Sequence, residues 1–160
     1  MNKKIGMYSS SVNFIAVICF AVSMLFGFDF GSYFFSMFIA FSFVAMICGY
    51  AHFAEKDVKL AGFVSVAFSI IYATIILFVY FAQLTTVRLN DLTHQAAALL
   101  DFQQCGLLFN YDLLGYGVMS LAALFAGLTI KSQTKADKWL KYLLMVHGVF
   151  FISCLIVPML

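Results

Sequence analysis

The histidines and cysteines are the side chains whose chemistry could support catalysis or metal binding, and His147 stands out among them. It lies eight residues after Trp139, inside an apolar stretch that ends at Leu160. In a helix this separation places the imidazole about 12 Å along the axis, at about 1.5 Å per residue. An ionisable side chain inside an apolar span is costly and indicates a functional site. A neutral imidazole can ligate a metal, relay a proton or sense pH.

A structural role for His147 is the alternative. The imidazole would then be neutral and hydrogen-bonded to a group on a neighbouring helix. Candidate partners at a similar depth are Cys19, Ser23 and Ser42. Unsatisfied polar groups are expensive in hydrocarbon, so both roles predict that His147 faces the interior of a helix bundle.

Cys48 and His52 form the one candidate pair of metal ligands. Their spacing of four places them on one face of a helix, which suits two ligands of one metal ion. No further ligand is evident, and His52 can instead pair with Glu55 one turn later. The sequence therefore predicts no metal centre and no cofactor.

Recognised catalytic motifs are missing. There is no Gly-rich phosphate loop, nucleophile elbow or HExxH sequence. No acidic residue falls within the apolar stretches, so no carboxylate-driven proton or sodium pathway is expected. These features favour a non-enzymatic protein. The alternative is a membrane-embedded enzyme, or a redox or metal protein, centred on His147.

The composition is that of an integral membrane protein. Of 160 residues, 64% are hydrophobic and 10% are charged, whereas soluble domains are about half apolar and about a quarter charged. The predicted partner is the lipid bilayer. The net charge of +2 is too small to indicate nucleic-acid binding.

Five apolar stretches are long enough to cross a bilayer, which takes about 20 helical residues. They are 11–28, 33–53, 60–83, 113–130 and 139–160. The predicted fold class is all-α: a polytopic bundle of five transmembrane helices forming one membrane domain over residues 1–160. The uncharged end at Leu160 is expected at the outer interface, or else within a longer protein that has a sixth helix.

The polar segment 85–111 between the third and fourth stretches has helical features of its own. Asn90 or Asp91 can cap a short amphipathic helix over 92–104, with Gly106 as its stop. This helix is expected to lie on the outer membrane surface or to cap the bundle. The alternative is a structured connector.

The basic residues predict the orientation. Eight of the nine lysines and arginines fall on the side of the membrane that holds the N-terminus, and only Arg88 falls on the other. The eight are Lys3, Lys4, Lys56, Lys59, Lys131, Lys135, Lys138 and Lys141. The positive-inside rule therefore predicts a multi-pass protein of the cell membrane with its N-terminus in the cytoplasm.

Small residues recur at helical spacing in the third and fourth stretches. Helices in lipid associate by close packing, so small residues mark their contact faces. The predicted faces consist of Gly62, Ser65, Ser69, Gly117, Ser120, Ala123 and Gly127. We expect contacts within the bundle. The alternative is contact with a second copy or with another membrane protein.

Three short segments stand out in the last third of the chain: Asp112-Leu113-Leu114-Gly115-Tyr116-Gly117, Lys138-Trp139-Leu140 and His147-Gly148-Val149-Phe150. Through these segments the chain resembles a group of bacterial multi-pass membrane proteins that have no assigned function. It implies a membrane bundle and no particular activity. The leading expectation is a small accessory subunit or a component of a small-solute transport system.

Overall fold

The computed structural model describes residues 1–160 and is helical throughout, with no strands. Five helical segments are long and apolar enough to cross a membrane, which confirms the all-α class and that helix count. They are α1 (Asn2–Leu25), α2 (Asp29–Phe53), α3 (Lys59–Ala82), α5 (Leu107–Thr129), and α6 (Lys135–His147) continuing into α7 (Phe150–Ile156). The shorter elements are η1 (Lys56–Val58), η2 (Gln83–Val87), α4 (His94–Leu100), η3 (Phe102–Gln104) and η4 (Val157–Met159).

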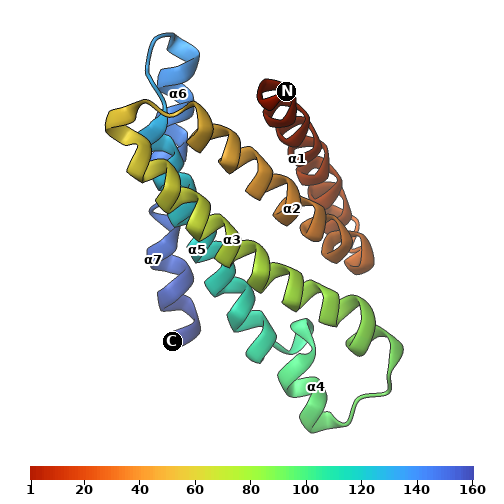
Figure 1. Cartoon of the computed structure of the whole chain (residues 1–160). Coiled ribbons are helices and arrows are strands. Elements are labelled where there is room, and N and C mark those ends of the chain that lie inside the picture. The colour runs from red at the N-terminus through yellow and green to blue at the C-terminus, as the bar shows by residue number, and fades with distance from the viewer.

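The long helices form an open row, not a closed bundle (Figure 1). α1 packs mainly on α2, α2 on α3, α3 on α5, and α5 on both α6 and α7. Consequently α5 is the most buried of the five, while α1 and the last segment are the least buried. The shared core lies where α2, α3 and α5 meet, and it includes Ile47, Tyr72, Ile76, Val79, Leu108 and Ala122.

Small residues allow α3 to approach α2 on one side and α5 on the other. A β-carbon at Gly62 would lie only 3.0 Å from the Cα of Ala51 on α2. On the other side, the Ser65 hydroxyl donates a hydrogen bond of 2.6 Å to the carbonyl of Ala122 on α5. This bond crosses between two helices at a fully buried position.

Small residues of α5 likewise face the last two helices. A β-carbon at Gly117 would lie 3.2 Å from the Cβ of Cys154 on α7, and one at Gly127 would lie 3.1 Å from Met145 on α6. The remaining residues of the two predicted faces are also buried: Ser69, Ser120 and Ala123.

Several helix ends differ from the expected ones. α1 begins at Asn2, and α5 begins at Leu107 rather than at residue 113. The expected surface helix over 92–104 is instead α4 followed by a separate 3-10 turn, because the side chains of Thr93 and Asp101 cap these two elements. Gly106 does not end that helix but precedes the first residue of α5.

The earlier start of α5 corrects one expectation directly. The expected fourth span began at residue 113 and left Asp112 outside it. In the structure Asp112 lies in the second turn of α5, a helix long and apolar enough to cross a membrane. The prediction that no acidic residue falls within a span is therefore wrong.

Candidate functional site

Asp112 is the most unusual side chain in the structure. It is 4% exposed, and its Oδ1 atom is buried without a hydrogen-bond partner. A buried carboxylate without a partner is costly, because water no longer solvates its charge. Such groups are rare in helices that cross membranes, and they mark functional sites.

Three tyrosines and a serine surround Asp112, and together we call these five residues the tyrosine–aspartate cluster: Ser36, Tyr72, Tyr80, Asp112 and Tyr116. The hydroxyls of Tyr80 and Tyr116 are 3.5 Å apart, and the Asp112 carboxyl neighbours Tyr80. The rings of Tyr72 and Tyr116 have centroids 6.0 Å apart, and Ser36 lies beside Tyr116. Three helices thus bring five polar side chains to one place.

The helical repeat explains this convergence. Asp112 and Tyr116 are four residues apart on α5, so they share a face. Tyr72 and Tyr80 are two turns apart on the face of α3 that packs against α5. Ser36 completes the cluster from α2, which packs against α3.

The cluster has more polar atoms than hydrogen bonds. Besides Asp112 Oδ1, the hydroxyls of Ser36 and Tyr72 are buried without a partner, and these residues are 1% and 0% exposed. Buried polar groups in proteins are normally paired, so unpaired ones are places where water or an ion can bind. A hydroxyl can both donate and accept, and a carboxylate accepts. The cluster can therefore hold water, a proton or another small hydrogen-bonding species.

The loop after α4 closes the cluster at the end of the molecule opposite the N-terminus (Figure 1). Gln83, which is 3% exposed, donates from Nε2 to the Leu100 carbonyl at 2.7 Å and accepts at Oε1 from the Phe102 amide at 3.1 Å. These bonds hold the Phe102 ring beside Tyr33 and Tyr80, with centroids 5.8 and 6.2 Å away. Phe102 thus covers the cluster on the side of this loop.

A small polar cavity lies just outside this closure. Its volume is about 170 Å³, and its lining includes Asp29, Tyr33, Arg88, Asp101 and Gln103. The Gln103 amide donates to Asp29 and to the Tyr33 hydroxyl, at 3.4 Å each. Tyr33 stacks on Tyr80 with centroids 5.4 Å apart. The outer cavity and the tyrosine–aspartate cluster are thus separated by one layer of aromatic rings.

The residues proposed from sequence around His147 are not brought together. His147 ends α6, is half-buried and makes no hydrogen bond, and its ring centroid lies 5.4 Å from that of Phe150. Ser23 donates to the Cys19 carbonyl within α1, and Ser42 on α2 accepts from Asn13 on α1 at 3.0 Å. α1 packs mainly on α2, whereas α6 packs mainly on α5.

The pair Cys48 and His52 lies at the end of α2. His52 Nε2 is 3.0 Å from the Asn2 amide nitrogen, and Cys48 is exposed. No group of three or more His, Cys, Asp or Glu side chains is assembled anywhere in the chain.

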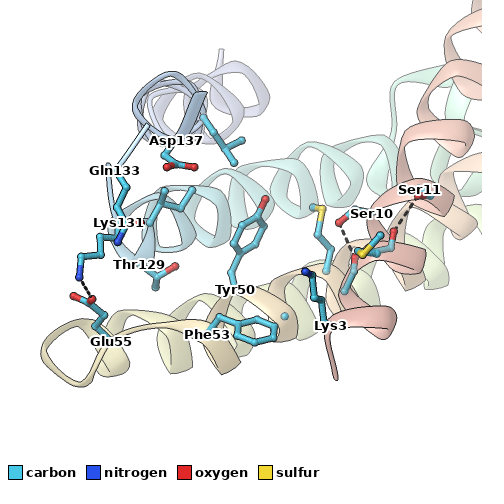
Figure 2. A pocket seen from close by; sticks show the side chains of 16 residues that line it. Lys3, Ser10, Ser11, Tyr50, Phe53, Glu55, Thr129, Lys131, Gln133 and Asp137 are labelled. Atoms are coloured by element: carbon cyan, nitrogen blue, oxygen red, sulfur yellow. Dashed lines mark hydrogen bonds and ion pairs between the residues drawn. The ribbon is translucent and has the colours of Figure 1, made fainter. Parts of the chain in front are cut away.

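A larger cavity opens at the other end of the molecule, between α1 and α6 (Figure 2). Its volume is about 690 Å³, and its lining also includes the end of α2 and Thr129, the last residue of α5. Lys131 and Glu55 form an ion pair at its edge, and this pairing raises the pKa of the Lys131 ammonium group.

Asp112 was missed because Asn110-Tyr111-Asp112 looks like the end of a polar loop. The overlooked signal is the apolar run Leu107-Leu108-Phe109 that precedes it. This run starts the helix at Leu107 rather than at residue 113, so that Asp112 and Tyr116 become neighbours on one face.

The fold and the site define an all-helical protein with five segments suited to crossing a membrane and a carboxyl group enclosed among tyrosines. Comparisons with protein families, with curated proteins and with solved structures found no match. The functional argument therefore rests on the geometry of this chain.

Proposed function

We propose that this chain is a non-enzymatic, multi-pass protein of the cell membrane that belongs to a small-solute transport system and binds a proton at Asp112. The observation that carries this proposal is the set of three buried, unpaired polar atoms in the tyrosine–aspartate cluster. The eight-to-one split of basic residues supports a cytoplasmic N-terminus, which places the cluster toward the outer side.

A proton fits the chemistry of the cluster. A carboxylate removed from water is stabilised by a bound cation, and the proton is the smallest one. Acidic side chains facing the interior of a helix bundle commonly serve as proton relays in pumps and transporters. The hydroxyls of Tyr80 and Tyr116 stand next to Asp112 and can donate or accept as the carboxyl group changes its charge.

Further hydroxyls continue from the cluster toward the inner end. They are buried at or near the contact between α3 and α5, and they are Ser65, Ser69, Ser120 and Thr129. The Ser120 hydroxyl donates to the Tyr116 carbonyl at 3.0 Å, one turn below the cluster. Thr129 also lines the inner cavity. This series supports a polar route between Asp112 and the cytoplasmic side.

The test is proton movement in liposomes that contain the purified protein and a trapped pH-sensitive dye. A potassium gradient with valinomycin sets the membrane potential. We expect dye acidification with the natural protein and its loss with Asp112→Asn, which keeps the shape but cannot release a proton. Asp101→Asn is the matched control. Asp101 lies in the outer loop, and asparagine keeps the side-chain oxygen that accepts a hydrogen bond from the Gln103 amide. Equal dye responses from Asp112→Asn and the natural protein would disprove the proposal.

A further inference from the structure

The inner cavity lies at the other end of the molecule from the tyrosine–aspartate cluster, and it shares no residue with that cluster. α1 and α6 stand apart at this end of the row, and the space between them is the cavity of about 690 Å³. Pockets for small ligands measure about 300–1,000 Å³. The cavity is therefore large enough to take part of a lipid molecule.

The lining divides into a polar part and an apolar part. Its polar side chains come from the first half of α1, the end of α2 and the junction between α5 and α6. Those labelled in Figure 2 include Lys3, Ser10, Ser11, Tyr50 and Gln133. Its apolar side chains are Met7, Met46, Phe53, Ile130 and Leu140. A ligand that matches both parts must carry a polar head and a hydrocarbon tail.

The charges of the lining sum to zero but are unevenly placed. Glu55, Lys131 and Asp137 lie on one side of the cavity, and Lys3 lies on the other (Figure 2). Glu55 pairs with Lys131, and Asp137 accepts a hydrogen bond of 2.8 Å from the Thr134 amide. Lys3 has no ion-pair partner, since the Lys131–Glu55 pair is the one salt bridge in the structure. Lys3 therefore presents an uncompensated positive charge to the cavity.

Tyr50 adds a second free hydrogen-bonding group. Its ring stands in the cavity between Lys3 on one side and Thr129 and Lys131 on the other (Figure 2). The Tyr50 hydroxyl makes no hydrogen bond within the protein, so it is available to a ligand. The Lys3 ammonium group comes from α1 and the Tyr50 hydroxyl from α2, and both face the same cavity. Together they suit a phosphate group, which accepts from both.

We propose that this cavity binds the headgroup of an anionic phospholipid of the inner leaflet, with its phosphate at Lys3 and Tyr50. The basic residues place this end at the cytoplasmic surface, where headgroups lie. Basic pockets between spanning helices on that side are known to take anionic headgroups. One acyl chain runs along the apolar side chains of the same cavity.

The test uses the full chain purified in detergent and titrated with phosphatidylglycerol or phosphatidylcholine, with binding followed by native mass spectrometry. We expect the anionic lipid to bind about tenfold more tightly, a difference of about 1.4 kcal/mol. Lys3→Gln should abolish this preference, and Tyr50→Phe should weaken it. Lys4→Gln is the matched control, because Lys4 is exposed and does not line the cavity.

Three outcomes would overturn the proposal. Equal affinity for the two lipids would show that the site does not recognise charge. If Lys3→Gln and Lys4→Gln lowered the affinity for phosphatidylglycerol equally, the lipid would be attracted by the basic end of α1 as a whole and not by this cavity. Displacement of the lipid by millimolar inorganic phosphate would show a site for the free anion. Tyr50→Phe provides a second, independent reading if the Lys3 variant is poorly folded.

Discussion

Asp112→Asn should make the protein more stable while removing its proton-binding group. The Oδ1 atom of Asp112 is buried and unpaired. Leaving a buried polar group unsatisfied costs about 1–3 kcal/mol, and more when the group is charged. The amide of asparagine has the same shape, so its Oδ1 atom stays unpaired, but the buried charge is removed. Its NH₂ group can donate to the neighbouring hydroxyl of Tyr80.

We therefore expect the free energy of unfolding to rise by about 1–3 kcal/mol in Asp112→Asn. The assay is reversible unfolding by SDS in mixed micelles at neutral pH. Asp101→Asn is the control, and its stability should stay within about 0.5 kcal/mol of the natural protein. A loss of stability of 1 kcal/mol or more in Asp112→Asn would refute the reasoning, because the carboxylate would then be making net favourable contacts.

Three further predictions concern packing, the outer closure and topology. Gly127→Leu should lower the free energy of unfolding by about 1–3 kcal/mol, because the added β-carbon would lie 3.1 Å from Met145. Unchanged stability in the same SDS assay would show that this face is not close-packed. Gln83→Ala should speed hydrogen exchange at the Phe102 amide, which loses its acceptor; an unchanged exchange rate would mean that Gln83 does not hold the loop. Reporter fusions after Lys59 should read cytoplasmic and those after Gln95 extracytoplasmic, and the opposite readings would invert the proposed orientation.

The number and type of the long helices were predictable because each depends on local composition. An apolar stretch of spanning length carries its own signal, and all five were found. Helix ends were less predictable because they depend on caps and on the loop beyond. The start of α5 was placed at residue 113 because Asn110 and Asp112 are polar, whereas packing against α3 and α4 extends the helix back to Leu107.

The residues that form the site were not predictable, because they come from three helices that are far apart in the sequence. A local sequence pattern does not show which residues of different helices meet. Depth along a helix suggested that His147 could meet Cys19 or Ser23. Depth along a helix does not reveal which helices are neighbours. In the structure α1 packs on α2, whereas α6, which carries His147, packs on α5. Likewise, Asn13 lies inside the first span and bonds to Ser42, a contact that only the packing of α1 on α2 reveals.

The central claim is that Asp112 exchanges a proton at a site shielded from water. Infrared difference spectroscopy of the membrane-reconstituted protein across a pH titration measures this directly through the C=O stretch of protonated carboxyl groups. We predict a band that is present in the natural protein and in Asp101→Asn, and that is absent in Asp112→Asn. An identical set of carboxyl bands in Asp112→Asn and in the natural protein would contradict the claim.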